Sequence, residues 1–227
     1  MPGLIALVGG DEFRSGCEPM DRAILDVTGS ARPALLVIPT AAASSNPSKA
    51  ADNGVSYLSR LGAKASALMV LDEADANDGK LLSPVDSADL LYFTGGDPAH
   101  LLATLEGSLL LTKMKEALDR GAVVAGSSAG AMVMGSWMRF GGWVSALGIT
   151  PGVGILPHHE QSDGEEVSQD LGASAPEDLA ILGIDAKTGC LVGGGTWGVV
   201  GAGSVTAYHH GHWRRFTSGD VFDPAGA

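Results

Sequence analysis

Short apolar runs alternate with longer segments of helical periodicity through the first half of this chain. The apolar runs lie at residues 4–8, 34–38, 65–70, 90–93 and 122–125. Runs of this length, without polar alternation, are typical of strands that are buried on both faces of a sheet. The segments with apolar residues at helical spacing are 20–27, 47–61, 98–105 and 109–120. This order predicts an α/β fold: a three-layer arrangement in which a parallel sheet is covered by helices on both faces, with binding residues at the carboxyl ends of the strands.

The texture of the sequence changes after residue 150. Short apolar runs separated by glycines lie at 153–156, 179–184, 190–192, 199–200 and 205–208. This pattern favours a C-terminal β meander or hairpins packed on the edge of the sheet, within the same domain. We therefore expect residues 1–227 to form one domain. Residues 141–154 are rich in glycine without clear periodicity, and we expect an ordered loop over the site there.

Charge and composition restrict the partners of the protein. The 227 residues include 26 acidic and 14 basic side chains, a net charge of −12, which argues against binding to nucleic acid backbones. The first apolar run is too short for a signal peptide, and no run approaches the roughly 20 residues of a membrane span. Cys17 and Cys190 form no C-x-x-C pair, as expected of a reduced protein. We expect a cytoplasmic monomer or homodimer that binds neither nucleic acid, membrane, metal nor cofactor.

A candidate nucleophile follows the run at 122–125. Gly126 and Gly130 flank Ser128 in the pattern G-x-S-x-G, which is typical of a strand–turn–helix nucleophile elbow. The glycines leave room where a Cβ would clash in such a turn. Ser128 is therefore the candidate nucleophile, and the N–H of Ala129 is a candidate oxyanion donor. A tight turn between strand and helix without chemistry is the alternative explanation of the pattern.

A second turn, Gly95-Gly96-Asp97, closes the run at 90–93 and precedes a helical segment. Paired glycines let backbone N–H groups approach a ligand closely, so Gly96 is a candidate second oxyanion donor. Asp97 either caps the following helix or contacts the substrate.

A base for the serine is available in the pair His158-His159. Serine is a poor nucleophile until a base accepts its proton. Adjacent residues of an extended segment point to opposite sides, so only one of the two rings can face Ser128. We expect the other to be a surface residue.

Three further motifs do not support a function. Residues 9–13 spell GGDEF, which is found in diguanylate cyclases, but they follow the first strand without the half-domain that should precede them. Residues 201–203 lack the third glycine and the helix of a dinucleotide-binding motif, and fit a hairpin turn. The histidines His209, His210 and His212 have no accompanying cysteine or carboxylate cluster of the kind that binds metal.

Taken together, the order and spacing of these motifs resemble serine peptidase family S51, which includes dipeptidase E and cyanophycinase. The resemblance extends from Gly9-Gly10 through the turns at 95–97 and 126–131 and the Pro157-His158 pair to residues 182–185. It implies a fold like that of class I glutamine amidotransferases. It also implies Ser128 as nucleophile, His158 as base, and the amides of Gly96 and Ala129 as the oxyanion hole.

The chain departs from this family at the residue that orients the histidine. Where dipeptidase E and cyanophycinase have a glutamate, this chain has Ala186, with Asp185 one residue before it. Asp185 could reach the histidine from a shifted loop and complete a Ser-His-Asp triad. It could equally be a turn residue.

A second departure concerns specificity. Dipeptidase E has an arginine downstream of the catalytic histidine that pairs with an aspartate side chain of the substrate, whereas no Lys or Arg occurs here between Arg139 and Lys187. The stretch instead carries Glu160, Asp163, Glu165, Glu166, Asp170, Glu177 and Asp178. We expect weak or no cleavage of Asp-X dipeptides by a dipeptidase E-like hydrolase acting on a peptide, isopeptide or small-molecule amide. A catalytically weak binding or regulatory protein on the same scaffold is the alternative. A glutamine amidotransferase is less favoured because no cysteine is at the elbow.

Overall fold

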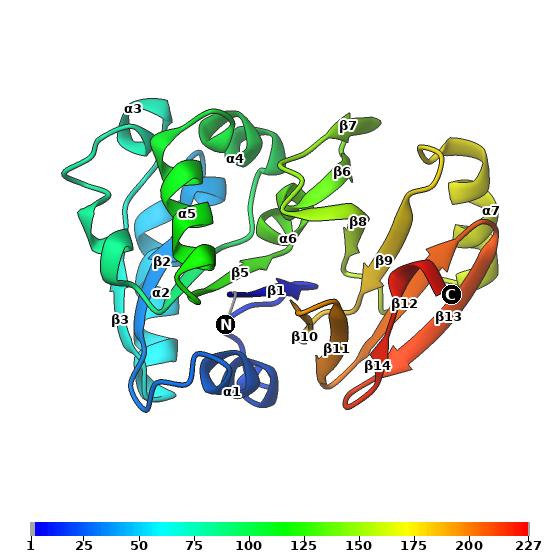
Figure 1. Ribbon diagram of the computed structural model, residues 1–227, viewed down its shortest axis with the longest axis horizontal. Coiled ribbons are helices and arrows are strands. Elements are labelled where there is room, and N and C mark those ends of the chain that lie inside the picture. Colours follow the sequence, from blue (N-terminus) through cyan, green and yellow to red (C-terminus); the bar gives the residue numbers. More distant parts are fainter. Residues whose placement is uncertain (1–2, 227) are drawn as a thin grey trace.

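An eight-stranded sheet forms the centre of the molecule in this computed structural model, which describes residues 3–226 (Figure 1). Along the sheet the strands are β14 (Val221–Phe222), β11 (Thr196–Gly201), β10 (Thr188–Gly193), β1 (Leu4–Val8), β5 (Val123–Ser127), β4 (Leu90–Phe93), β2 (Ala34–Ile38) and β3 (Lys64–Ala67). The five strands from β1 to β3 are parallel to one another, and β10, β11 and β14 are added in antiparallel pairing beside β1. The predicted α/β fold with a parallel sheet is confirmed.

Helices cover both faces of this sheet. They are α1 (Glu18–Asp26), α2 (Pro47–Arg60), α3 (Glu73–Ala76), α4 (Pro98–Leu105), α5 (Leu109–Asp119) and α6 (Ala129–Met134). A further helix, α7 (Gly164–Ser174), lies beside a second sheet. Along β2, Leu35 and Val37 belong to one buried cluster with side chains of α1 and α2, whereas Leu36 and Ile38 belong to another with side chains of α4 and α5. Because alternate residues of a strand point to opposite faces, a run that is apolar throughout supplies both cores.

The second sheet has six strands. Their order is β13 (His212–Thr217), β12 (Ser204–His209), β9 (Ala180–Ile184), β8 (Thr150–Pro157), β6 (Gly135–Arg139) and β7 (Trp143–Ser145). The C-terminal strands are thus divided between two sheets, since β10, β11 and β14 extend the central one. The cluster that fills the space under α4 and α5 also contains Ile155, Leu182 and Val205 of the second sheet. The two sheets therefore share one buried core, and the single domain stays a prediction.

The expectation of a loop over residues 141–154 is wrong. Only the residues 140–142 and the segment 146–149 separate the strands β6, β7 and β8 there. Gly154 of this region and the preceding Gly135 serve close packing between strands, whereas Gly141, Gly142, Gly148 and Gly152 have left-handed φ values and no atom close to a Cβ position. A Cβ on Gly154 would lie 2.9 Å from the Ile181 side chain, and one on Gly135 would lie 2.7 Å from the carbonyl oxygen of Val153. Glycine was therefore required by neighbours that its own sequence segment does not reveal.

Within residues 3–226, none of the helices has both the length and the apolar character needed to cross a membrane.

Candidate active site

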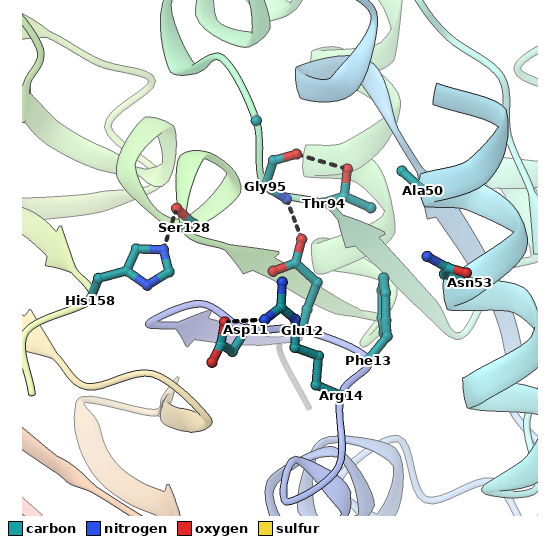
Figure 2. A pocket seen from close by; sticks show the side chains of 11 residues that line it. Asp11, Glu12, Phe13, Arg14, Ala50, Asn53, Thr94, Gly95, Ser128 and His158 are labelled. Atoms are coloured by element: carbon teal, nitrogen blue, oxygen red, sulfur yellow. Dashed lines mark hydrogen bonds and ion pairs between the residues drawn. The ribbon is translucent and has the colours of Figure 1, made fainter. Parts of the chain in front are cut away.

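A cavity of about 380 Å³ lies at the carboxyl ends of β1, β4 and β5 (Figure 2). It is lined by residues 11–14 of the β1–α1 loop (residues 9–17), residues 94–96 after β4, Ala50 and Asn53 of α2, and Ser128 and His158. The turn at 95–96, the candidate nucleophile and the candidate base, which are far apart in the sequence, therefore meet at one place. This is the edge of the sheet at which the parallel strands were expected to gather binding residues.

Ser128 occupies the sharp turn between β5 and α6. Its φ of 49° and ψ of −108° are unusual for a residue with a side chain, and its N–H donates to the carbonyl of Val8 at 2.9 Å. A Cβ on Gly126 would lie 2.4 Å from backbone atoms of Gly130, and one on Gly130 would lie 2.6 Å from the carbonyl oxygen of Phe93. Both glycines are needed for this turn, as the elbow pattern predicts.

His158 follows the end of β8 and faces Ser128. Its Nε2 lies 3.2 Å from Ser128 Oγ, within hydrogen-bond distance (Figure 2). Its backbone N–H donates to the carbonyl of Gly9 at 2.9 Å, and its φ of 54° is left-handed. The imidazole lies directly against Gly10, where a Cβ would be 2.1 Å from Cε1. The β1–α1 loop therefore supports the histidine.

His159 lies on the other side of the segment, away from Ser128. Its Nε2 is 2.6 Å from the hydroxyl of Tyr208, and burial lowers the pKa of its imidazole. The expectation that this second histidine is a surface residue is wrong, because only 4% of it is exposed. Alternation along the chain predicted that the two rings point in opposite directions. It could not predict that Tyr208 of β12, which is 49 positions away, covers His159.

The turn after β4 has two different parts. Gly96 has a φ of 144°, and a Cβ there would be 2.1 Å from the carbonyl oxygen of Ala41. Asp97 accepts hydrogen bonds from the N–H groups of Ala99 (2.9 Å) and His100 (3.2 Å), so its carboxylate caps α4. Asp97 is not among the residues that line the cavity. Of the two roles considered for it, this geometry favours the helix cap, and substrate contact stays a prediction.

Asp185 lies in the turn between β9 and β10. Its Oδ2 accepts hydrogen bonds from the N–H and the hydroxyl of Ser204, both at 2.8 Å. Within residues 3–226, no hydrogen bond joins Asp185 to His158. The nearby Glu160 accepts the N–H of Ala186 at 2.9 Å, and this bond lowers the pKa of the Glu160 carboxyl. The structure therefore brings Ser128 and His158 together but directs Asp185 to a neighbouring strand.

Glu12 lines the cavity and was not among the site residues expected from the sequence. Its Oε1 accepts the N–H of Gly95 at 2.8 Å, and its Oε2 accepts the hydroxyl of Ser127 at 2.7 Å. Glu12 belongs to the GGDEF pentapeptide, which was compared only with diguanylate cyclases and rejected as a motif of that class. The signal that could have identified Glu12 is its place in the loop after β1, the strand that pairs with β5.

Charge in the cavity comes from the β1–α1 loop. Arg14 Nη1 is 3.4 Å from Asp11 Oδ1, and 72% of the Arg14 side chain is exposed against 33% for Asp11 (Figure 2). With Glu12, the cavity lining contains two carboxylates and one guanidinium. Arg139 pairs with Asp170 of α7 instead and does not line the cavity.

The two cysteines are buried, and neither lines the cavity. Burial raises the pKa of the Cys17 thiol to about 11 and also raises that of Cys190. Neither thiol has the properties of a nucleophile at neutral pH.

Comparison with known proteins places this geometry in a family. The model of peptidase family S51 matches residues 4–199. A cyanophycinase from Synechococcus elongatus is 31% identical over 152 residues, which are 61% of this chain and 47% of that protein, so the chain spans about half the length of that relative. A cyanophycinase from Nostoc sp. is 25% identical over 219 residues, which are 89% of this chain and 72% of that protein.

Solved structures agree with the family match. The crystal structure of a peptidase from an acI-B1 actinobacterium matches with a TM-score of 0.86 at 27% identity, over 98% of this chain and 97% of that chain. A putative peptidase E protein from Listeria monocytogenes matches with a TM-score of 0.63 at 16% identity, over 89% of this chain and 100% of that chain, which shows a shared fold.

Proposed function

Since the chain belongs to peptidase family S51, we propose that it is a serine peptidase that cleaves a peptide or isopeptide bond with Ser128 as its nucleophile. The observation that carries this proposal is the pairing of Ser128 Oγ with His158 Nε2 at 3.2 Å, on a nucleophile elbow inside a cavity. A serine held in this way by an imidazole can lose its proton as it attacks.

The proposed reaction uses these two groups in turn. Ser128 Oγ bonds to the carbonyl carbon of the substrate while His158 Nε2 takes the hydroxyl proton. The C–N bond then breaks, His158 returns the proton to the departing amine, and an acyl-enzyme remains on Ser128. A water molecule, deprotonated by the same imidazole, attacks the ester; the ester C–O bond then breaks, His158 gives this proton to Ser128 Oγ, and the acid is released.

Two backbone amides are suited to hold the oxyanion. Ala129 is the first residue of α6, so its N–H has no acceptor within the helix. The N–H of Gly95 is taken by Glu12, which leaves the next amide, that of Gly96, at the edge of the cavity. Donors fixed before the reaction stabilise the developing negative charge without reorganisation.

We assign the proton transfer to the Ser128–His158 pair. Asp185, the candidate third member of a triad, is hydrogen-bonded to Ser204 and holds the turn between β9 and β10. The contacts of Gly9 and Gly10 with His158 position the imidazole in its place. Within the described residues, no carboxylate is hydrogen-bonded to the imidazole of His158. This observation supports the alternative, a weakly active or inactive binding protein.

The charge of the cavity bears on the substrate. Two carboxylates against one guanidinium, which already pairs with Asp11, favour a substrate that is neutral or basic near the scissile bond. Similarity to cyanophycinases supports testing isopeptides as well as α-dipeptides.

A hydrolysis screen tests the proposed function. The purified protein and its Ser128→Ala variant are incubated with matched libraries of dipeptides and β-linked isopeptides, and new amino groups are measured. Turnover by the wild-type protein alone supports the proposal. Equal turnover by both proteins would exclude Ser128 as the nucleophile, and no turnover by either would favour the binding protein.

A further inference from the structure

Glu12 links two loops that the chemistry uses. Ser127, which donates to one carboxylate oxygen, directly precedes the nucleophile and is fully buried. Gly95, which donates to the other oxygen, directly precedes Gly96. One side chain thus holds together the elbow and the turn that carries the second oxyanion amide. Figure 2 shows its bond to Gly95.

The loop that carries Glu12 is itself firmly anchored. The ring of Phe13 packs against Tyr92 at 5.0 Å and Tyr57 at 5.9 Å between centroids. The carbonyl of Asp11 accepts the thiol of Cys17, and that of Gly10 accepts the N–H of Lys187. Asp11 and Phe13 both have left-handed φ values, 59° and 63°, which persist only where the surroundings enforce them. The backbone that carries the Glu12 side chain is therefore held in place on both sides.

We propose that Glu12 is a positioning residue for the hydrolysis: its ionised carboxylate sets the separation between Ser128 and the amide of Gly96. This inference rests on the proposed function. Glu12 acts through Ser127 and Gly95 and takes no part in proton transfer.

The chemistry of the two contacts favours a carboxylate. Both partners donate to Glu12, and a carboxylate is an acceptor at each of its oxygens. A glutamine can accept the Gly95 N–H with its oxygen, but its NH2 then faces Ser127, whose hydroxyl must turn to accept it, so two charge-assisted bonds become two neutral ones. Hydrogen bonds to a carboxylate are also stronger than those between neutral groups.

A change in this separation is expected to affect the transition state more than substrate binding. The oxyanion forms only after attack, so an amide displaced from it lowers kcat and leaves KM nearly unchanged. A misplacement of about 1 Å in a catalytic site can cost about 100-fold in rate. We expect Glu12→Gln to lower kcat by roughly 10- to 100-fold.

The test compares Glu12→Gln, Ser127→Ala and the double variant with the wild-type protein, by kcat and KM on a substrate from the hydrolysis screen. Glu18→Gln is the matched control, because Glu18 accepts the N–H of Gly16 at 2.7 Å in the same part of the chain but does not line the cavity. Hydrogen exchange of the backbone around residues 94–97 and 126–130 is measured on the same proteins and does not depend on activity.

The inference predicts that Glu12→Gln lowers kcat, keeps KM within about threefold, and speeds exchange in both segments, whereas Glu18→Gln does none of these. It also predicts that Ser127→Ala has less effect on the Glu12→Gln background than on the wild type. A wild-type kcat in Glu12→Gln, or a change in KM without a change in kcat, would overturn it. So would kcat losses of Glu12→Gln and Ser127→Ala that multiply fully in the double variant, or unchanged hydrogen exchange in the two segments. A wild-type protein without turnover would defeat the proposed function and the catalytic part of this inference, while exchange would still decide whether Glu12 links the loops.

Discussion

The imidazole of His158 rests on Gly10, with no room between them for a methyl group. A Cβ at Gly10 would lie 2.1 Å from Cε1 and 2.5 Å from Nε2, the atom that faces Ser128. The start of the β1–α1 loop therefore positions the candidate base. The contact is made by the second glycine of the pentapeptide GGDEF.

Replacement of Gly10 by alanine should separate this packing role from general strain in the loop. We expect Gly10→Ala to displace the ring and lower kcat by about 100-fold or more. Gly16→Ala is the control: its φ of 95° is also left-handed, but the nearest atom to a Cβ there is 3.4 Å away, on the flexible side chain of Lys187. The two variants should have similar circular dichroism and different rates. Equal rates would show that His158 is not held by Gly10.

The role of Asp185 can be measured against that of its partner. Asp185→Ala removes both hydrogen bonds from Ser204, so we expect it to lower stability by about 1–3 kcal/mol. Ser204→Ala removes only the hydroxyl bond and should lower stability less, and both variants should lower kcat by less than about 10-fold. Urea denaturation and steady-state kinetics check this. A kcat loss of about 10⁴-fold in Asp185→Ala, with little effect of Ser204→Ala, would instead show that Asp185 completes a Ser-His-Asp triad.

Asp21 predicts a pH dependence of stability. It is 1% exposed, and burial, together with the charges of Glu18 and Glu12, raises the pKa of its carboxyl from 3.8 to about 7. Between these values the folded protein binds the proton more tightly than the unfolded chain, so the contribution of Asp21 to stability falls as pH rises from about 4 to 7. The full loss is on the order of 4 kcal/mol at about 1.4 kcal/mol per pKa unit.

The measurement for Asp21 is urea denaturation of the wild-type protein and Asp21→Asn at pH 5 and pH 8. Comparison of the two proteins cancels the titration of all other groups. We expect the stability of Asp21→Asn relative to the wild type to increase by at least about 1 kcal/mol between pH 5 and pH 8. The same difference at both pH values would mean that Asp21 titrates normally in the folded protein.

The charge of the cavity predicts substrate preference. We expect Ala-Leu and Lys-Leu, or their isopeptide equivalents, to be cleaved at higher kcat/KM than Asp-Leu, because Asp11 and Glu12 repel a substrate carboxylate. Among the residues that the structure describes, Arg14 is the one Lys or Arg that lines this cavity and could oppose the trend. Selective cleavage of Asp-Leu that is lost in Arg14→Gln would contradict the prediction and assign the carboxylate contact to Arg14.

Much of the central sheet could be predicted because its signals are local. The bounds of β1, β2, β4 and α4 agree with the apolar runs and the helical segment identified in the sequence. Gly126 of the elbow was also predictable, since the clash that it avoids is with Gly130, within one turn of chain, whereas Gly130 avoids the distant Phe93. These elements depend on periodicity and on steric limits that a short window contains.

The remainder depends on tertiary contacts. Short strands such as β9 and β10 carry no signal for their partners, so their assignment to different sheets could not be predicted. Alternation predicted that His158 and His159 diverge, but not that Tyr208 buries the second ring. The contacts of Glu12 join residues separated by 83 and 115 positions, which a single sequence does not relate.

The proposed function requires Ser128 to be a nucleophile that is activated by His158. The most direct measurement is the rate of covalent labelling by a small serine-reactive phosphonate, followed by mapping of the modified peptide. We predict labelling at Ser128, none in Ser128→Ala, strongly slowed labelling in His158→Ala, and labelling near the wild-type rate in folded His159→Ala. Modification at another residue, or labelling that depends on His159 and not on His158, would contradict the account.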